Sequence, residues 1–170
     1  LGSERLRTRT AALRSLTRLD ASLISTADLP GFLQQEFDHI YHLLSGLGEG
    51  WGAAFESSLT FEINESIRRI FHLMMLQYDP KMVESAMLNV EHVSKEKRAN
   101  AIEILDNIIP RHEYLALHAL LEENTPEHKR SVLAKTVCRQ IVSRPLLRFI
   151  LGGGVTKFSE WTLVQAIRAT

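Results

Sequence analysis

Apolar side chains recur at helical spacing along most of the chain, and no segment shows the alternation of apolar and polar residues that is typical of a β-strand. In the clearest case, Ile63, Ile67, Ile70, Phe71 and Met74 fall on one side of a helix that ends near residue 77. Glycine and proline are confined to a few positions. The pattern therefore predicts an all-α protein with about eight or nine helices.

Helix boundaries follow from residues that favour the first turn of a helix. Asp79-Pro80 and Thr125-Pro126 are start signals. The Asp or Thr side-chain oxygen can accept a hydrogen bond from an unpaired backbone amide of the first turn, and proline at the first helical position sacrifices no backbone hydrogen bond. Ser94 is expected to cap a further helix. The expected helices span residues 3–23, 28–47, 53–77, 80–90, 94–109, 112–122, 144–151 and 160–170, with one more beginning at 126.

Two glycine-rich segments, residues 46–52 and 152–154, are expected to connect or interrupt helices. Neither has the glycine spacing or the preceding strand of a phosphate-binding loop, so we interpret both as turns.

Small residues recur in the later helices. Ala101, Ala134 and Ala166 lie 32–33 residues apart, and alanine lets neighbouring helices approach closely. This period predicts an α-solenoid of stacked antiparallel helix pairs over residues 79–170, with residues 1–78 forming less regular N-terminal helices that pack on the repeats. The chain starts without methionine and ends inside an apparent helix. We therefore expect one continuous domain that is part of a longer protein.

The residues from Lys97 to Leu105 resemble the second helix of a HEAT repeat, in which an arginine, here Arg98, precedes alanine and spaced aliphatic residues. Residues 78–110 and 143–170 are similar to the HEAT-like regions fused to bacterial ATP/ADP-translocase-like transporter domains, and Trp161 stands where that group has a tryptophan at the start of a second helix. The resemblance implies a bacterial, cytoplasmic helical-repeat region.

Composition excludes some classes of function. Lys and Arg together number 20 and are balanced by 20 Asp and Glu, which argues against a general nucleic-acid binder. No apolar run is long enough for a membrane span. The single cysteine, Cys138, excludes an intramolecular disulfide, and its apolar neighbours Val137 and Ile141 indicate a buried structural thiol.

One group of residues has the spacing of a metal site. Glu36, His39 and His42 lie at i, i+3 and i+6, and a helical Glu-x-x-His unit is what di-iron helix bundles use. Such sites need a second unit and further carboxylates, which the sequence does not supply. We therefore predict no metal, no cofactor and no catalytic residue.

The leading hypothesis is a non-enzymatic scaffold that contacts another protein or another domain of the same chain, as the cytoplasmic regulatory region of a transporter-like membrane protein. Its candidate binding residues are Arg98, Trp161, Met74 and Met82, because methionine adapts to irregular partners and tryptophan anchors interfaces. The alternative is a sensory domain that holds a small molecule between the N-terminal helices. The residues expected to line that pocket are Phe37, Tyr41, Phe71 and Met74.

Overall fold

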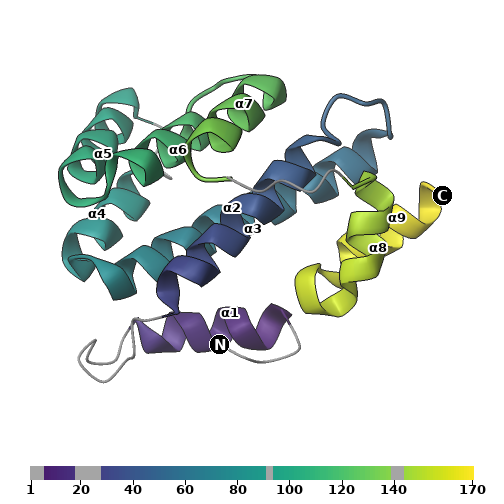
Figure 1. Cartoon of the computed structure of the whole chain (residues 1–170), viewed down its shortest axis with the longest axis horizontal. Coiled ribbons are helices and arrows are strands. Elements are labelled where there is room, and N and C mark those ends of the chain that lie inside the picture. The colour runs from purple at the N-terminus through teal and green to yellow at the C-terminus, as the bar shows by residue number, and fades with distance from the viewer. Residues whose placement is uncertain (1–5, 18–27, 91–93, 139–143) are drawn as a thin grey trace.

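The computed structural model describes residues 6–17, 28–90, 94–138 and 144–170, apart from the side chains of Lys95 and Arg98 (Figure 1). Over these ranges it contains only helices and no β-strand, which confirms the all-α prediction. The helices are α1 (Leu6–Leu16), α2 (Leu29–Leu44), α3 (Ala53–Gln77), α4 (Pro80–Val90), α5 (Lys95–Ile108), α6 (Arg111–Leu121), α7 (Pro126–Thr136), α8 (Leu146–Lys157) and α9 (Glu160–Arg168). None of these helices is long and apolar enough to cross a membrane.

The antiparallel pair of α2 and α3 is the centre of the molecule (Figure 1). The 25-residue helix α3 contacts α1, α2, α4 and α9. Figure 1 shows α4 to α7 on one flank of this pair and α8 and α9 on the other, with α1 alongside. Because α7 packs on α2 and α9 packs on α3, the later helix pairs gather around the central one. The predicted solenoid is not confirmed, and the division at residue 78 stays a prediction.

Two of the predicted helix starts have the expected hydrogen bonds. The Asp79 carboxylate accepts from the amides of Lys81 and Met82, at 3.0 and 3.1 Å, and the Thr125 hydroxyl accepts from the amide of His128 at 3.3 Å. Ser94 precedes α5 as expected, but its hydroxyl makes no capping hydrogen bond.

The core contains the apolar face predicted for α3, since Ile70, Phe71 and Met74 are at most 1% exposed. Ala101 and Ala166 are also fully buried. Ala134 is exposed, however, and Leu133 takes the buried position on α7. The prediction of a close contact at Ala134 is therefore wrong. The 32–33-residue period points to position 134, whereas α7 is rotated about its axis so that the preceding residue, Leu133, faces the core.

The second glycine segment bends a helix instead of ending it. We expected a helix from 144 to 151, whereas α8 runs to Lys157 with a kink at Gly154, whose φ is 51°. The neighbouring Gly153 lets the ring of Phe158 approach, since a Cβ atom there would lie 2.6 Å from the ring. The kinked end of α8 thus folds back over Phe158, which is buried. The first segment, residues 46–52, connects α2 and α3 as predicted.

The end of α2 meets the start of α8 at Gly46, which is buried. A Cβ atom at this position would collide with the side chain of Leu146 and lie 2.9 Å from that of Leu59. Gly46→Ala should therefore lower the free energy of unfolding by about 1–2 kcal/mol, because both leucines belong to the core and must shift. Urea denaturation measures the change.

Gly31 is the matched control, because it lies in the first turn of α2 and a Cβ atom added there would have no neighbouring atom within 4 Å. Gly31→Ala should raise the free energy of unfolding by about 0.4–1 kcal/mol, since alanine restricts the unfolded chain. A loss of stability in Gly31→Ala that equals the loss in Gly46→Ala would contradict this packing.

Candidate functional site

A row of polar side chains lies inside the molecule on α3. Glu62, Ser66 and Arg69 are spaced by four and three residues, which places them on the same side of the helix. Glu62 and Ser66 are fully buried, and Arg69 is 4% exposed. Burying charged groups is costly unless they find partners, so this row constrains the helices that pack against it.

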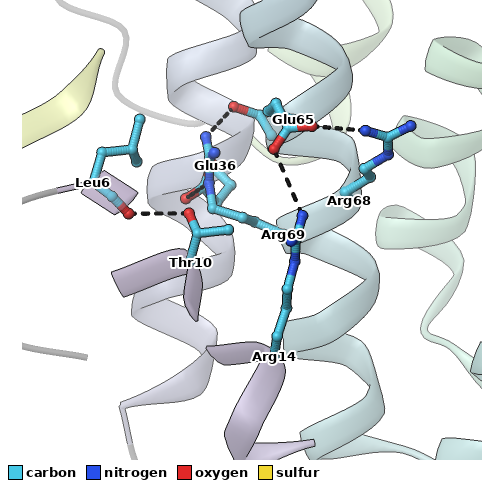
Figure 2. A network of polar contacts seen from close by, with 8 residues as sticks. Leu6, Thr10, Arg14, Glu36, Glu65, Arg68 and Arg69 are labelled. Atoms are coloured by element: carbon cyan, nitrogen blue, oxygen red, sulfur yellow. Dashed lines mark hydrogen bonds and ion pairs between the residues drawn. The ribbon is translucent and has the colours of Figure 1, made fainter. Parts of the chain in front are cut away.

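Arg69 finds its partner on α2. Its guanidinium donates through Nε and Nη2 to the two carboxylate oxygens of Glu36, at 2.9 and 3.0 Å, and Nη2 also donates to the Ser66 hydroxyl at 2.6 Å. Figure 2 shows this pair beside a more exposed one, in which Glu65 contacts Arg68 and Arg14 of α1. The two-point geometry fixes α2 and α3 in one relative register.

Glu62 binds the start of α9. Its Oε1 atom accepts from the amide of Ser159 at 2.8 Å and from the hydroxyl of Thr162 at 2.7 Å. The Ser159 hydroxyl accepts in turn from the amide of Thr162 at 3.2 Å. A carboxylate at a helix N-terminus is favourable because unpaired amides and the helix dipole meet it there. The other oxygen, Oε2, is buried and has no hydrogen-bond partner within the described part of the chain.

A cleft of about 270 Å³ opens between α1, α2, α3 and α8. The lining residues are Leu6, Arg9, Gln35, Glu36, Asp38, His39, Tyr41, His42, Arg69, Arg144, Phe149 and Lys157. A second cavity of about 590 Å³ lies between α1, α3 and the end of α8. Leu6 and Arg69 line both cavities, so the buried pair of Arg69 and Glu36 stands close to the boundary between them.

Two histidines of α2 face this first cleft. The His39 ring packs between Phe149 and Phe158, with centroid distances of 5.7 and 4.8 Å, and its Nε2 atom is buried without a partner in the part of the chain that the structure describes. Burial, and then the positive charge of Arg69, hold the pKa of His39 well below its ordinary value. The His42 ring lies 4.5 Å from that of Phe149, and burial also lowers its pKa. Both imidazoles are therefore neutral at pH 7.

The Glu-x-x-His spacing does not form a metal site in this arrangement. Glu36 is engaged by Arg69, and His39 is enclosed by phenyl rings. Among the described residues, no three side chains of His, Cys, Asp or Glu come together as metal ligands would. The lone thiol of Cys138 is buried as predicted, and burial raises its pKa, which disfavours the reactive thiolate.

The four candidate binding residues lie apart. Trp161 is exposed on α9, and Met82 is exposed on α4, on the opposite flank of the molecule (Figure 1). Met74 is fully buried in the core, so a partner at the surface cannot reach it, and this corrects its choice as a binding residue. Arg98 belongs to α5, but its side chain lies outside the described part.

Most of the residues expected to line a pocket for the alternative function do not line one between the first helices. Phe37, Phe71 and Met74 are at most 1% exposed and pack in the core instead of lining a cavity between the first helices. Tyr41 does line the cleft.

Sequence reasoning missed Arg69 and Glu62 as internal residues, although apolar residues on more than one side of the long helix α3 indicated that some of its charged residues would be enclosed.

Breaking the internal ion pair should be far more harmful than breaking a surface pair. Glu36→Ala leaves the Arg69 guanidinium buried without its carboxylate and should lower the free energy of unfolding by about 3 kcal/mol. Asp106→Ala removes an exposed ion pair with Arg111 and should cost less than about 1 kcal/mol. Equal losses in urea denaturation would show that the internal pair is not structurally important.

His39 should make stability depend on pH. Unfolded His39 takes up a proton near pH 6.5 whereas folded His39 does not, so stability is full above that pH and falls as the pH drops. The loss should approach about 1.4 kcal/mol for each pH unit below 6.5. His42 and His72, whose pKa values burial also lowers, add in the same direction.

Denaturation of His39→Phe at several pH values tests this assignment. Phenylalanine suits the neighbouring aromatic rings and cannot be protonated, so the variant should lose less stability in acid than the unaltered protein. His128→Phe is the control because His128 is exposed on α7. If His39→Phe keeps the acid sensitivity of the unaltered protein, His39 is not the group responsible.

Comparison of the chain with models of known protein families, with curated proteins and with solved structures finds no match. The resemblance to HEAT-like repeat regions therefore stays a prediction based on residue pattern, and function has to be argued from the geometry of this chain.

Proposed function

We propose that this chain is a non-enzymatic helical module that mediates protein–protein or interdomain contacts. The observation that supports the proposal is an apolar surface formed by Phe61, Trp161, Val164 and Ile167, called here the α9 face. Each of these side chains is 41 to 61% exposed.

The α9 face is continuous across two helices. Trp161, Val164 and Ile167 are spaced by three residues on α9, on the side away from the buried Thr162 and Ala166. The ring of Phe61 from α3 meets the Trp161 ring edge to face, with centroids 5.6 Å apart. Two exposed apolar residues of α8, at positions 151 and 155, extend the apolar character of this flank.

A surface of this kind supports a role in binding. Scattered exposed apolar residues are ordinary, but adjacent aromatic and aliphatic side chains on one face are typical of interaction sites. Tryptophan is enriched among the residues that contribute most to interface affinity. A protein surface with a complementary apolar pocket would cover the α9 face and remove these side chains from water.

The resemblance in sequence gives this role its proposed context. We place the module on the cytoplasmic side of a transporter-like membrane protein, where its paired helices would act as HEAT-like repeats. The pairing of neighbouring helices in the chain supports a repeat origin. Among the candidate binding residues we retain Trp161 as the anchor of the proposed contact.

Site-specific photocrosslinking tests the proposal. A photoreactive phenylalanine analogue replaces Trp161 in the full chain as it occurs in the cell, and the same analogue replaces Leu88 in a second sample. Leu88 is the control because it is an exposed apolar residue on α4, away from the α9 face. We expect one discrete crosslinked product, to another domain or another protein, from position 161 and none from position 88.

A further substitution makes the crosslinking result decisive. Ile167→Asp places a charge on the α9 face and should reduce the product from position 161 by at least about tenfold, because a buried unpaired charge opposes docking. The same products from positions 161 and 88, or a product that Ile167→Asp leaves unchanged, would contradict an interaction through the α9 face.

One observation favours the alternative function, a domain that holds a small molecule near its N-terminal helices. The cleft between α1, α2, α3 and α8 contains the buried His39, whose Nε2 atom lacks a partner among the described residues. This cleft lies beside the core residues that were expected to form the pocket. The small-molecule role is therefore a second candidate function.

A further inference from the structure

We propose that the cleft between α1, α2, α3 and α8 binds a small anion that carries a phosphate or carboxylate group. The inference gives the alternative function a ligand class and is independent of the α9 face. It is carried by the convergence on one cavity of cationic side chains from α1, α3, α8 and the segment that leads into α8.

The cations reach the cleft from different parts of the chain. Arg9 comes from α1, Arg69 from α3, Arg144 from the segment before α8, and Lys157 from the end of α8. Arg9 also donates to the carbonyl of Thr156 at the kinked end of α8, which holds its guanidinium at the cleft. Against these four cations the lining holds two carboxylates, Glu36 and Asp38, so the cleft keeps a net positive charge although the whole chain has none.

The two carboxylates of the cleft offset only part of this positive charge. Glu36 and Arg69 neutralise each other in their two-point pair, so the excess positive charge comes from the other three cations. Asp38 accepts a hydrogen bond from the amide of Gln34 at 2.9 Å and is the one other acidic residue in the lining. Arg144 and Lys157 make no hydrogen bond or ion pair with any residue that the structure describes, so their donors are available to a ligand.

His39 places a titratable ring in the wall of the cleft. Its side chain is 8% exposed, it lines the cleft, and its Nε2 atom has no partner in the described structure. The Nε2 atom itself is closed to solvent, so a ligand in the cleft would meet the remaining exposed part of the ring, where an anion would offset the positive charge of the neighbouring cations. The lowered pKa of His39 fits the same picture, because burial and then nearby cations disfavour a further positive charge.

Size and chemistry limit the occupant. The volume of about 270 Å³ lies just below the range of about 300–1,000 Å³ for pockets of drug-sized ligands. Arginine and lysine donors match the oxygens of phosphate and carboxylate groups. The rings of Tyr41 and Phe149 provide an apolar wall for a short carbon skeleton. A small phosphate ester or a short dicarboxylate satisfies all three conditions.

Titration with inorganic phosphate and with succinate, followed by NMR at neutral pH and by calorimetry, tests the proposal. At least one anion should bind saturably, with a dissociation constant of about 1 mM or lower in moderate salt, and should shift the imidazole signal of His39, which His39→Phe identifies. Stronger binding of one anion than of the other distinguishes a phosphate ligand from a carboxylate ligand. Raising the salt concentration should weaken binding.

The variant Arg144→Gln/Lys157→Gln should weaken binding at least about tenfold, because it removes the two cations that have no partner among the described residues. Both residues are exposed, so the fold should persist. The control Arg148→Gln/Lys135→Gln makes the same change in charge at exposed positions outside the cleft and should bind as the unaltered protein does.

Three outcomes overturn the inference: no saturable binding of either anion, equal weakening in both double variants, or saturation without any shift of His39. The cleft variants leave Phe61, Trp161, Val164 and Ile167 unchanged. Failure here therefore leaves the proposed contacts of the α9 face untouched, and failure of the crosslinking leaves the anion site untouched.

Discussion

The requirement to satisfy charged groups inside α3 is the constraint on which the remaining structure depends. This helix is covered by α1, α2, α4 and α9, yet it carries Glu62 and Arg69 on an enclosed side. Each charge needs a partner from another helix, because unpaired buried charges are strongly destabilising. Glu36 on α2 forms an ion pair with Arg69, and Glu62 accepts hydrogen bonds from the start of α9. Apolar packing supplies most of the stability, and these two contacts fix how the helices are oriented.

Both proposals follow from these orientations. Since Glu62 holds the start of α9, the helix turns Thr162 inward and leaves Trp161 on the surface. Since Glu36 is already paired with Arg69, it does not neutralise the other cations of the cleft. The same internal row thus contributes to the position of the apolar contact surface and to the charge of the cleft. The two sites share no side chain, since none of the four residues of the α9 face lines the cleft.

Local signals made most of the helices predictable, and long-range contacts account for what was missed. The caps at Asp79 and Thr125 and the apolar face of α3 depend on neighbouring residues, so residue type and periodicity predict them well. The exposure of Ala134 shows that a repeat spacing does not fix the rotation of a helix about its axis. The candidate site was harder to predict, because the paired residues Glu36 and Arg69 are 33 positions apart in the sequence. Periodicity shows that a helix is buried, but it does not name the partner of a buried charge.

Native-state hydrogen exchange of Glu62→Leu tests most directly whether the internal row of α3 organises the fold. Leucine keeps the volume approximately but removes the oxygen that accepts from Ser159 and Thr162. The account predicts that amides of α9 lose protection by about 10- to 100-fold, because the helix detaches locally. Amides of α6 and α7, which lie away from Glu62, should change much less. Unchanged protection of α9, or an equal loss in α6, α7 and α9, would contradict the claim that Glu62 positions this helix.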